Sequence, residues 1–191
     1  DMLRQASDAA KQLITLSDQT IIGILKETAQ VLRTHTEEVL AANRQDLERM
    51  DPANPKYDRL KLTEERLQGI AADMENVSTL PSPLNKVLSE TTRPNGMVIR
   101  KVTVPFGVIG VIYEARPNVT FDVFSLCFRS GNVCVLKGGS DADFSNRALV
   151  RIIHSVLERQ GINPAVCTLL PPDREATAEL LGAVGLVDFI I

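Results

Sequence analysis

The stretch VPFGVIGVIYEARPNVTFDVFSLCFRSGNVCVLKGG, residues Val104 to Gly139, decides the fold of this chain. Its pattern predicts a strand, a tight polar turn, a short helix, a second strand and a Lys-Gly-Gly turn. Parallel α/β folds of this kind bind ligands at the carboxyl ends of their strands. The turn from Glu114 to Asn118 places a carboxylate, a guanidinium and an amide within five residues. A purely structural turn does not need that chemistry.

The rest of the chain's second half repeats the alternation. Short apolar runs rich in β-branched residues predict strands over 108–113, 132–136, 166–170 and 187–191. Helical spacing predicts helices over 119–129, 143–160 and 173–183 between them. Buried strands alternating with helices indicate a parallel sheet covered on both faces. The predicted fold class is therefore α/β, with a Rossmann-type parallel sheet.

Three predicted helices make up the first half. One covers about 2–16, a second follows an N-cap at Ser17 and keeps its apolar stripe through His35 and Val39, and a third opens at Thr63. Residues 1–80 are thus a helical part attached to the sheet.

Residues 81–103 predict a β-hairpin arm. Its strands, 86–92 and 97–103, join around an Asn95-Gly96 pair, which favours a tight turn. A half-exposed arm of this kind is suited to pairing with another subunit. Residues 104–191 form the parallel α/β core. The apolar run 187–191 reads as a buried strand with no helix after it, so we expect this core to be incomplete.

Composition excludes several functions. The formal net charge of −3 argues against a nucleic-acid partner, which calls for a basic surface. No apolar run approaches the roughly 18 residues that a membrane helix needs. The chain shows no signal-peptide pattern, so a cytoplasmic location is the expectation.

The cysteines and histidines do not predict a catalytic or metal site. Cys127, Cys134 and Cys167 lack metal-ligand spacing and have apolar flanks, which indicates buried, unreactive thiols. His35 and His154 lie on helices without a neighbouring carboxylate or cysteine, which favours packing or surface roles. We therefore expect no metal.

The best cofactor candidate is the run Lys137-Gly138-Gly139-Ser140 at the end of a strand. A lysine there can bond ribose hydroxyls or neutralise a phosphate, and the glycines allow a close approach to the backbone. A solvated lysine before an ordinary turn is the structural alternative. The Gly107–Gly110 pair lies inside a strand, where packing is the expected role.

Polar residues of the first turn are the candidates for substrate chemistry. Asn118 could donate to an oxyanion formed in acyl transfer, or it could be a turn or N-cap asparagine. Glu114 and Arg116 could pair with each other or face an anionic substrate. The sequence leaves both questions open.

The run from Val104 to Thr120 closely resembles the signature of the γ-glutamyl phosphate reductases, or glutamate-5-semialdehyde dehydrogenases, of the aldehyde dehydrogenase superfamily. The resemblance extends to the Lys137-Gly138-Gly139 turn and to the N-terminal segments Ala41–Leu47 and Asp58–Leu60. It implies the aldehyde dehydrogenase fold with an oligomerisation arm, hence a homo-oligomer. It also implies NADPH-dependent reduction of L-glutamyl 5-phosphate in proline biosynthesis, and glutamate 5-kinase as a partner.

The resemblance also implies residue roles. Lys137 resembles the cofactor-ribose lysine of the superfamily, and Asn118 resembles its oxyanion asparagine. The family's catalytic cysteine forms a thioester and lies in a domain downstream of the matched segment. We therefore expect a chain truncated before its catalytic domain and inactive alone. The alternatives are a non-catalytic nucleotide-binding or interaction module and an acyl-CoA-reducing relative.

Overall fold

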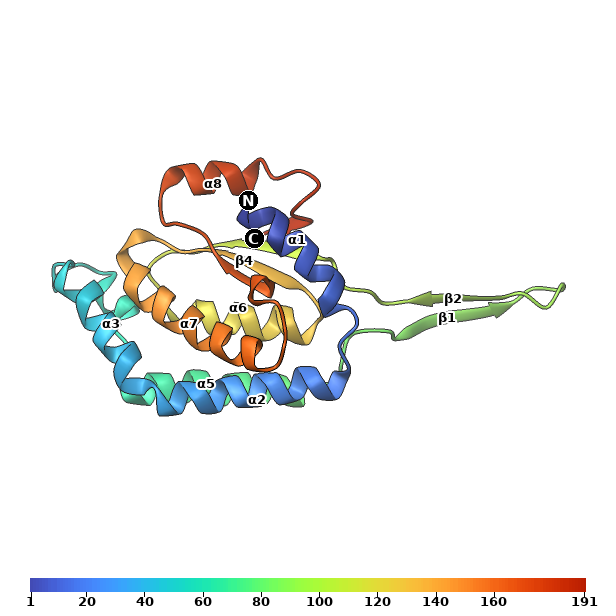
Figure 1. Ribbon diagram of the computed structural model, residues 1–191, viewed down its shortest axis with the longest axis horizontal. Helices are drawn as coiled ribbons and strands as arrows, with labels where there is room; N and C mark the ends of the chain where they lie inside the picture. The colour runs from blue at the N-terminus through green and yellow to red at the C-terminus, as the bar shows by residue number, and fades with distance from the viewer.

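A computed structural model describes all residues from Asp1 to Ile191. It has an α/β body from which a two-stranded arm projects (Figure 1). The helices are α1 (Met2–Leu13), α2 (Asp18–Thr34), α3 (Thr36–Glu48), α4 (Tyr57–Leu60), α5 (Glu64–Thr79), α6 (Asn118–Arg129), α7 (Asp143–Arg159) and α8 (Arg174–Leu181). The strands are β1 (Val87–Thr92), β2 (Val98–Val102), β3 (Val108–Ile112), β4 (Val133–Lys137), β5 (Cys167–Leu169) and β6 (Phe189–Ile190).

The body is built on a four-stranded parallel sheet in the order β5-β4-β3-β6. The register pairs Val108 with Val133 and Ile112 with Lys137, so β3 and β4 end at the same level. Successive strands β3, β4 and β5 lie side by side in one direction, and the chain then returns to place β6 on the other side of β3. This reversal makes the end of β3 a topological switch point, where α/β sheets bind ligands.

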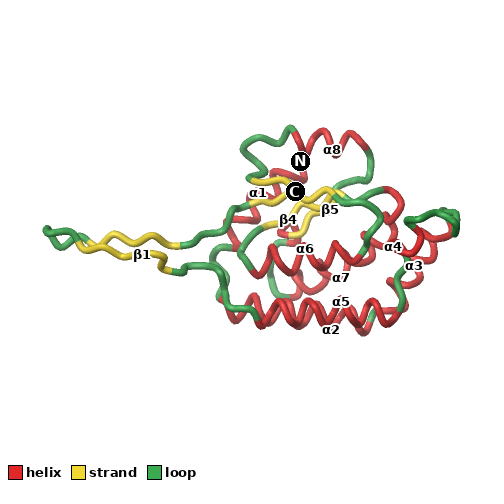
Figure 2. Tube along the Cα trace, turned by 180° about the vertical axis from the view of Figure 1, so that it is seen from behind, coloured by secondary structure: helices red, strands yellow, loops and turns green.

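Helices cover both faces of the sheet. Helices α6 and α7 lie on one face, and α1 and α8 lie on the other (Figure 1). Helices α2 and α5 pack side by side against the outer surfaces of α6 and α7, as the reverse view also shows (Figure 2). One cluster of 40 buried residues runs through these layers, with Phe121, Phe124 and Phe128 of α6 among its largest members.

The helix boundaries confirm the two predicted caps and correct one prediction. The hydroxyls of Ser17 and Thr63 accept hydrogen bonds from backbone N–H groups in the first turns of α2 and α5. The prediction of one helix continuing through Val39 was wrong, because the chain breaks at His35, where φ is −113° and ψ is 22°. The Thr36 hydroxyl donates to carbonyls of the preceding turn, which gives the backbone an alternative to a continuous helix. Since Val39 is still buried, the apolar spacing alone did not signal the break.

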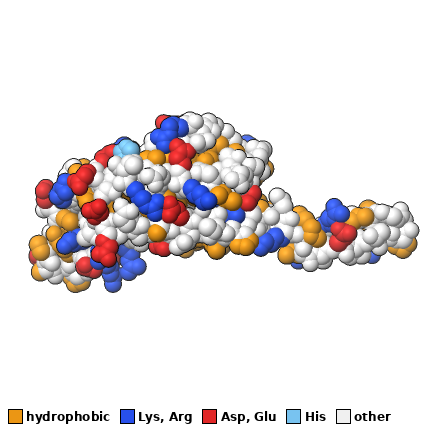
Figure 3. Space-filling model, turned by 90° about the horizontal axis from the view of Figure 1, so that it is seen from below, with side chains coloured by type: hydrophobic (Ala, Val, Ile, Leu, Met, Phe, Trp, Pro, Cys, Tyr) orange, Lys and Arg blue, Asp and Glu red, His pale blue; other side chains and the backbone are white.

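The predicted hairpin is present and stands away from the body. Strands β1 and β2 pair antiparallel, and Gly96 has a φ of 82° in the turn between them. Every residue of both strands is exposed, including apolar residues that would normally be buried. Seen from below, the arm carries both apolar and charged side chains along its length (Figure 3).

Gly107 and Gly110 have the packing role expected of them, although Gly107 precedes β3 and only Gly110 lies inside it. Gly107 has a φ of 119°, and a Cβ there would lie 2.2 Å from Asp188 Oδ2, which accepts a hydrogen bond from Val108 N. A Cβ on Gly110 would lie 3.0 Å from the Leu180 side chain of α8. Both positions therefore need glycine for close packing. None of the helices is both long enough and apolar enough to cross a membrane.

Candidate functional site

The two polar turns singled out in the sequence meet at the carboxyl edge of the sheet. Tyr113 N donates to Lys137 O over 3.1 Å, which extends the β3–β4 ladder to the last residue of β4. A Cβ on Gly139 would lie 3.7 Å from the backbone of Glu114. The Glu114–Asn118 turn and the Lys137–Ser140 turn are therefore neighbours, as the parallel topology predicts.

Lys137 is not a solvated lysine. Its side chain is buried, and its ammonium donates to the carbonyls of Gly138 (3.0 Å) and Pro172 (3.2 Å). It forms no ion pair with any carboxylate of the chain. A buried ammonium can donate three hydrogen bonds and favours an anionic or hydroxyl-rich neighbour. The charge at the end of β4 is thus stabilised only by backbone dipoles.

The turn after Lys137 is shaped by a network that the sequence did not reveal. The Tyr113 hydroxyl bonds Thr120 Oγ1 (2.7 Å), which donates to Asn146 Oδ1 (3.1 Å). Burial raises the pKa of Tyr113 well above its usual value, so the phenol stays protonated. A Cβ on Gly138 would lie 2.3 Å from Asn146 Nδ2. Gly138 is therefore required by this network, because its Cβ direction points into the protein.

Asp46 gives the N-terminal segment Ala41–Leu47, which is part of the family resemblance, a structural role beside the site. Its buried carboxylate accepts hydrogen bonds from Phe144 N (3.2 Å), Ser145 N (2.8 Å) and Ser145 Oγ (2.7 Å). It also pairs with Arg49, whose guanidinium donates to the carbonyl of Ser140. The carboxylate thus holds the first turn of α7, where a negative charge is favoured. Residues of α3 thereby fix the turn that contains Gly139 and the exposed Ser140.

Residues of the other turn have different surroundings. Glu114 is exposed and lies 3.7 Å from Lys56 Nζ, and Arg116 forms no ion pair. The two residues therefore do not pair with each other. Asn118 is the first residue of α6 and makes no capping bond; its Nδ2 donates to Asp122 Oδ2 over 3.1 Å. Burial is the main reason that the pKa of Asp122 is raised, and the Asn118 hydrogen bond opposes the rise.

Arg116 and Asn118 line a cavity of about 380 Å³, which we call the charged cavity. Its lining comes from the α4–α5 segment and the N-terminal end of α6. Figure 2 shows α4 at the end of the molecule far from the hairpin. The lining residues are Asp58, Arg59, Lys61, Leu62, Arg66, Gly69, Ile70, Asp73, Arg116 and Asn118. The sequence signalled only the last two, since the others lie some fifty residues earlier in the chain.

The three thiols lie in the interior of the protein. Cys127, Cys134 and Cys167 are all buried. The pKa of Cys127 is raised by its contact with Cys134 and by burial, and the pKa of Cys134 is also raised. Nucleophilic cysteines need the opposite, a pKa lowered by positive surroundings. The expectation of buried thiols is therefore confirmed, and the raised pKa values of Cys127 and Cys134 disfavour their thiolates.

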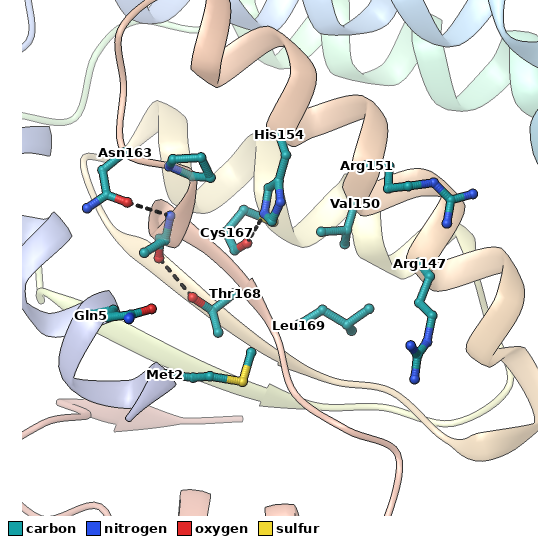
Figure 4. Close-up of a pocket in the computed structure, with 12 residues that line it drawn as sticks. Met2, Gln5, Arg147, Val150, Arg151, His154, Asn163, Cys167, Thr168 and Leu169 are labelled. Carbon is teal, nitrogen blue, oxygen red and sulfur yellow. Dashed lines mark hydrogen bonds between the residues drawn. The ribbon is translucent and has the colours of Figure 1, made fainter.

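A larger cavity of about 560 Å³ lies at the edge of the sheet, between α1, α7 and β5 (Figure 4). His154 Nε2 bonds the carbonyl of Cys167 (2.7 Å), and the Thr168 hydroxyl donates to the carbonyl of Ala165 (3.0 Å). These two side chains are thus engaged by the backbone, and the lining residues Arg147 and Arg151 pair with Asp143 and Glu38. None of the predicted site residues lines this cavity.

The fold is that of the aldehyde dehydrogenases. A probable aldehyde dehydrogenase of Listeria monocytogenes superposes on 99% of this chain with a TM-score of 0.74 at 16% identity, over 40% of its own length. The glyceraldehyde-3-phosphate dehydrogenase of Methanocaldococcus jannaschii, solved with NADP, gives a TM-score of 0.73 at 17% identity, covering 99% of this chain and 39% of its own.

Within this fold, the chain is similar to γ-glutamyl phosphate reductase. The enzyme of that name from Parabacteroides distasonis is 98% identical over the whole chain, which covers 46% of the relative. The one from Bacteroides thetaiotaomicron is 64% identical over 96% of this chain and 44% of its own. The structure of the Thermotoga maritima enzyme superposes with a TM-score of 0.94 at 30% identity, covering 99% of this chain and 47% of that one.

These relatives confirm the resemblance that the sequence carries. The chain spans about half the length of the curated relatives it matches. No protein-family model matches the chain.

Proposed function

We propose that this chain is the cofactor-binding part of an enzyme that reduces L-glutamyl 5-phosphate to L-glutamate 5-semialdehyde with NADPH, releasing phosphate, in proline biosynthesis. The single observation that carries the proposal is the 98% identity to γ-glutamyl phosphate reductase over every residue of the chain. Since its own three thiols are buried, the nucleophilic cysteine of this reaction lies outside residues 1–191.

The cofactor is assigned to the Lys137–Ser140 turn. The donors present there fit the ribose of a dinucleotide: a buried ammonium without a carboxylate partner and an exposed Ser140 hydroxyl beside it. The NADP held by the Methanocaldococcus jannaschii neighbour supports a nicotinamide cofactor for this fold. When bound, the cofactor supplies the hydride for the reduction. The role of Lys137 is to bind and orient the cofactor, and Gly138 and Gly139 allow the backbone to lie close to it.

The reacting carbonyl is assigned to the turn after β3. A primary amide carries two N–H groups, and Asn118 commits one of them to Asp122. The second can donate to the oxygen that becomes negative as the carbonyl is attacked. Of the two charged residues that the sequence offered for substrate binding, Arg116 is the stronger candidate, because Glu114 is already near Lys56.

The hairpin is assigned to assembly. Its strands expose a row of apolar side chains and unpaired edge groups, which a second copy of the chain could cover. A homo-oligomer located in the cytoplasm, with glutamate 5-kinase supplying its unstable acyl phosphate, fits this arrangement. These assignments are parts of the same proposal.

The test is the reaction run in reverse with the whole enzyme that contains this segment. Purified protein is mixed with L-glutamate 5-semialdehyde, phosphate and NADP⁺, and NADPH is followed by its absorbance. We expect NADPH formation that requires phosphate. Formation that requires coenzyme A instead would support the acyl-CoA-reducing alternative, and no reaction with either acceptor would support the non-catalytic one.

A further inference from the structure

The charged cavity contains cations that have no partner in the protein. Arg66 is engaged, since its guanidinium donates to the Asp58 carboxylate (3.1 Å) and to the carbonyls of Asp58 and Lys61 (both 2.6 Å). The side chains of Arg59, Lys61 and Arg116 form no ion pair and no hydrogen bond within the chain. Three cations around one cavity repel one another, and a bound anion would relieve that repulsion.

The same cavity has one lining carboxylate without a cation, and a second unpaired carboxylate is bonded to its lining. Asp73 lines it and forms no ion pair. Asp122 is half-buried next to the lining, where its carboxylate accepts a hydrogen bond from the amide of Asn118, which lines the cavity. The Asp73 carboxylate is one of the groups that raise the pKa of Asp122, after burial, so the two negative charges repel each other. A bound cation would relieve this repulsion.

Unpaired charges of both signs thus line one small cavity whose wall includes the proposed oxyanion donor. We propose that the charged cavity binds the zwitterionic end of an α-amino acid substrate, with its carboxylate on Arg116 and the neighbouring cations and its ammonium on Asp73 and Asp122. This inference rests on the proposed function, because L-glutamyl 5-phosphate and its semialdehyde carry both groups at the end away from the reacting carbon. Arg116 and Asp73 are then specificity-determining residues.

The position in the fold supports this assignment. Arg116 and Asn118 are separated by one residue, so a ligand bonded by Arg116 has its other end within reach of the Asn118 amide. Both residues follow β3 at the switch point of the sheet, beside the turn assigned to the cofactor. The packing of α5 against α6 adds the acidic side of the cavity. One ligand can therefore touch recognition groups and reaction groups together.

The anion on Arg116 could in principle be the phosphate of the acyl phosphate instead of the α-carboxylate. Both are oxyanions that a guanidinium binds in the same way. The experiment distinguishes the two anions by measuring the KM for phosphate, which is a separate reactant in the reverse direction.

The experiment uses the full-length enzyme with Asp73→Asn and Arg116→Gln, and with Glu37→Gln and Arg4→Gln as controls of matched charge at exposed positions without ion-pair partners. KM is measured in the reverse direction for L-glutamate 5-semialdehyde, for 5-oxopentanoate, which lacks the amino group, and for 4-aminobutanal, which lacks the carboxylate. Each variant is compared with the unmodified enzyme on the same substrate, so cyclisation of a substrate cancels from the ratio.

We expect Asp73→Asn to raise the KM for the semialdehyde about tenfold or more and to leave that for 5-oxopentanoate unchanged, because a charge-assisted bond is lost only where an ammonium is present. Arg116→Gln should raise the KM for the semialdehyde by a similar factor but not that for 4-aminobutanal. Neither variant should change the KM for phosphate, and the controls should change none of these values.

Two failures are distinguishable. An unmodified enzyme that does not oxidise the semialdehyde at all contradicts the proposed function. If the unmodified enzyme is active, three results overturn the zwitterion site alone. The variants could raise KM equally for substrates with and without the group concerned, raise KM for no substrate, or raise the KM for phosphate.

Discussion

The two turns at the carboxyl edge of the sheet are neighbours with opposite characters. After β4, the Lys137–Ser140 turn is internally bonded: the ammonium meets two carbonyls, Gly138 lies against Asn146, and Asp46 holds the helix that follows. After β3, the turn leaves Arg116 unpaired beside a cavity with further unpaired charges. The Lys137–Ser140 turn is held in a fixed shape by the protein, whereas the Glu114–Asn118 turn presents charges that a ligand can neutralise. A cofactor suits the Lys137–Ser140 turn, and a charged substrate suits the Glu114–Asn118 turn.

The largest expected effect comes from removing the residue that supports the Lys137–Ser140 turn. Asp46→Ala leaves the backbone N–H and the hydroxyl of Ser145, and Phe144 N, without their acceptor in a buried site. Each buried group left unsatisfied costs about 1–3 kcal/mol, so a loss of about 3 kcal/mol or more is expected. Thermal unfolding of the full-length enzyme measures this as a lower Tm.

Its control is Glu48→Ala, an exposed residue of the same helix without an ion-pair partner. That change should alter stability by less than about 0.5 kcal/mol. Equal Tm shifts for the two variants would show that Asp46 does not hold the turn.

Lys137→Met tests the cofactor side of the comparison. Methionine keeps the apolar stem of the buried lysine but removes the ammonium. Hydrogen bonds from a charged donor are worth about 1.5–3 kcal/mol, which corresponds to a rise in the NADPH Kd of about tenfold or more. Fluorescence titration with NADPH measures the change.

The matched control is Lys26→Met, an exposed lysine on α2 without an ion-pair partner. It should bind NADPH with unchanged affinity. If Lys137→Met also binds normally, the ammonium has only the structural role of bridging the ends of β4 and the loop after β5.

The smallest effect is expected from Asp122→Asn, and it changes with pH. The pKa of Asp122 is raised in the folded protein, mainly by burial, so the native state holds this proton more tightly than the unfolded chain does. The native protein is therefore favoured at low pH and loses that advantage as the pH rises through the raised pKa. Asparagine carries no such charge, so the variant should have the higher Tm at pH 7.

This gain should shrink as the pH falls toward about 4, near the ordinary pKa of an aspartate, because the unmodified protein is then protonated at the same site. Differential scanning calorimetry between pH 4 and pH 8 measures both curves. A Tm difference that stays constant over this range would contradict a raised Asp122 pKa.

The sheet could be predicted from the sequence because buried parallel strands have continuous apolar runs, as in Val133–Leu136. The hairpin was signalled by Asn95-Gly96. The break at His35 could not be predicted, since neither glycine nor proline marks it and Val39 keeps the helical spacing. The four-residue helix α4 is too short for any periodicity to indicate it.

The site was predictable only where its residues follow a strand directly. Glu114, Arg116, Asn118 and Lys137 could be placed at the carboxyl edge by topology alone. The acidic and basic residues of the α4–α5 segment reach the same place through the packing of α5 on α6, a contact between segments some fifty residues apart. No local pattern encodes such a contact, so the charged cavity becomes visible only in the folded chain.

Cofactor and substrate are assigned to two separate turns, and one crossed kinetic measurement tests that separation directly. In the full-length enzyme, the KM for NADP⁺ and the KM for L-glutamate 5-semialdehyde are determined for Lys137→Met and for Arg116→Gln. We predict that Lys137→Met raises only the first value and that Arg116→Gln raises only the second. Two variants that raise both values alike would contradict the assignment of cofactor and substrate to separate turns.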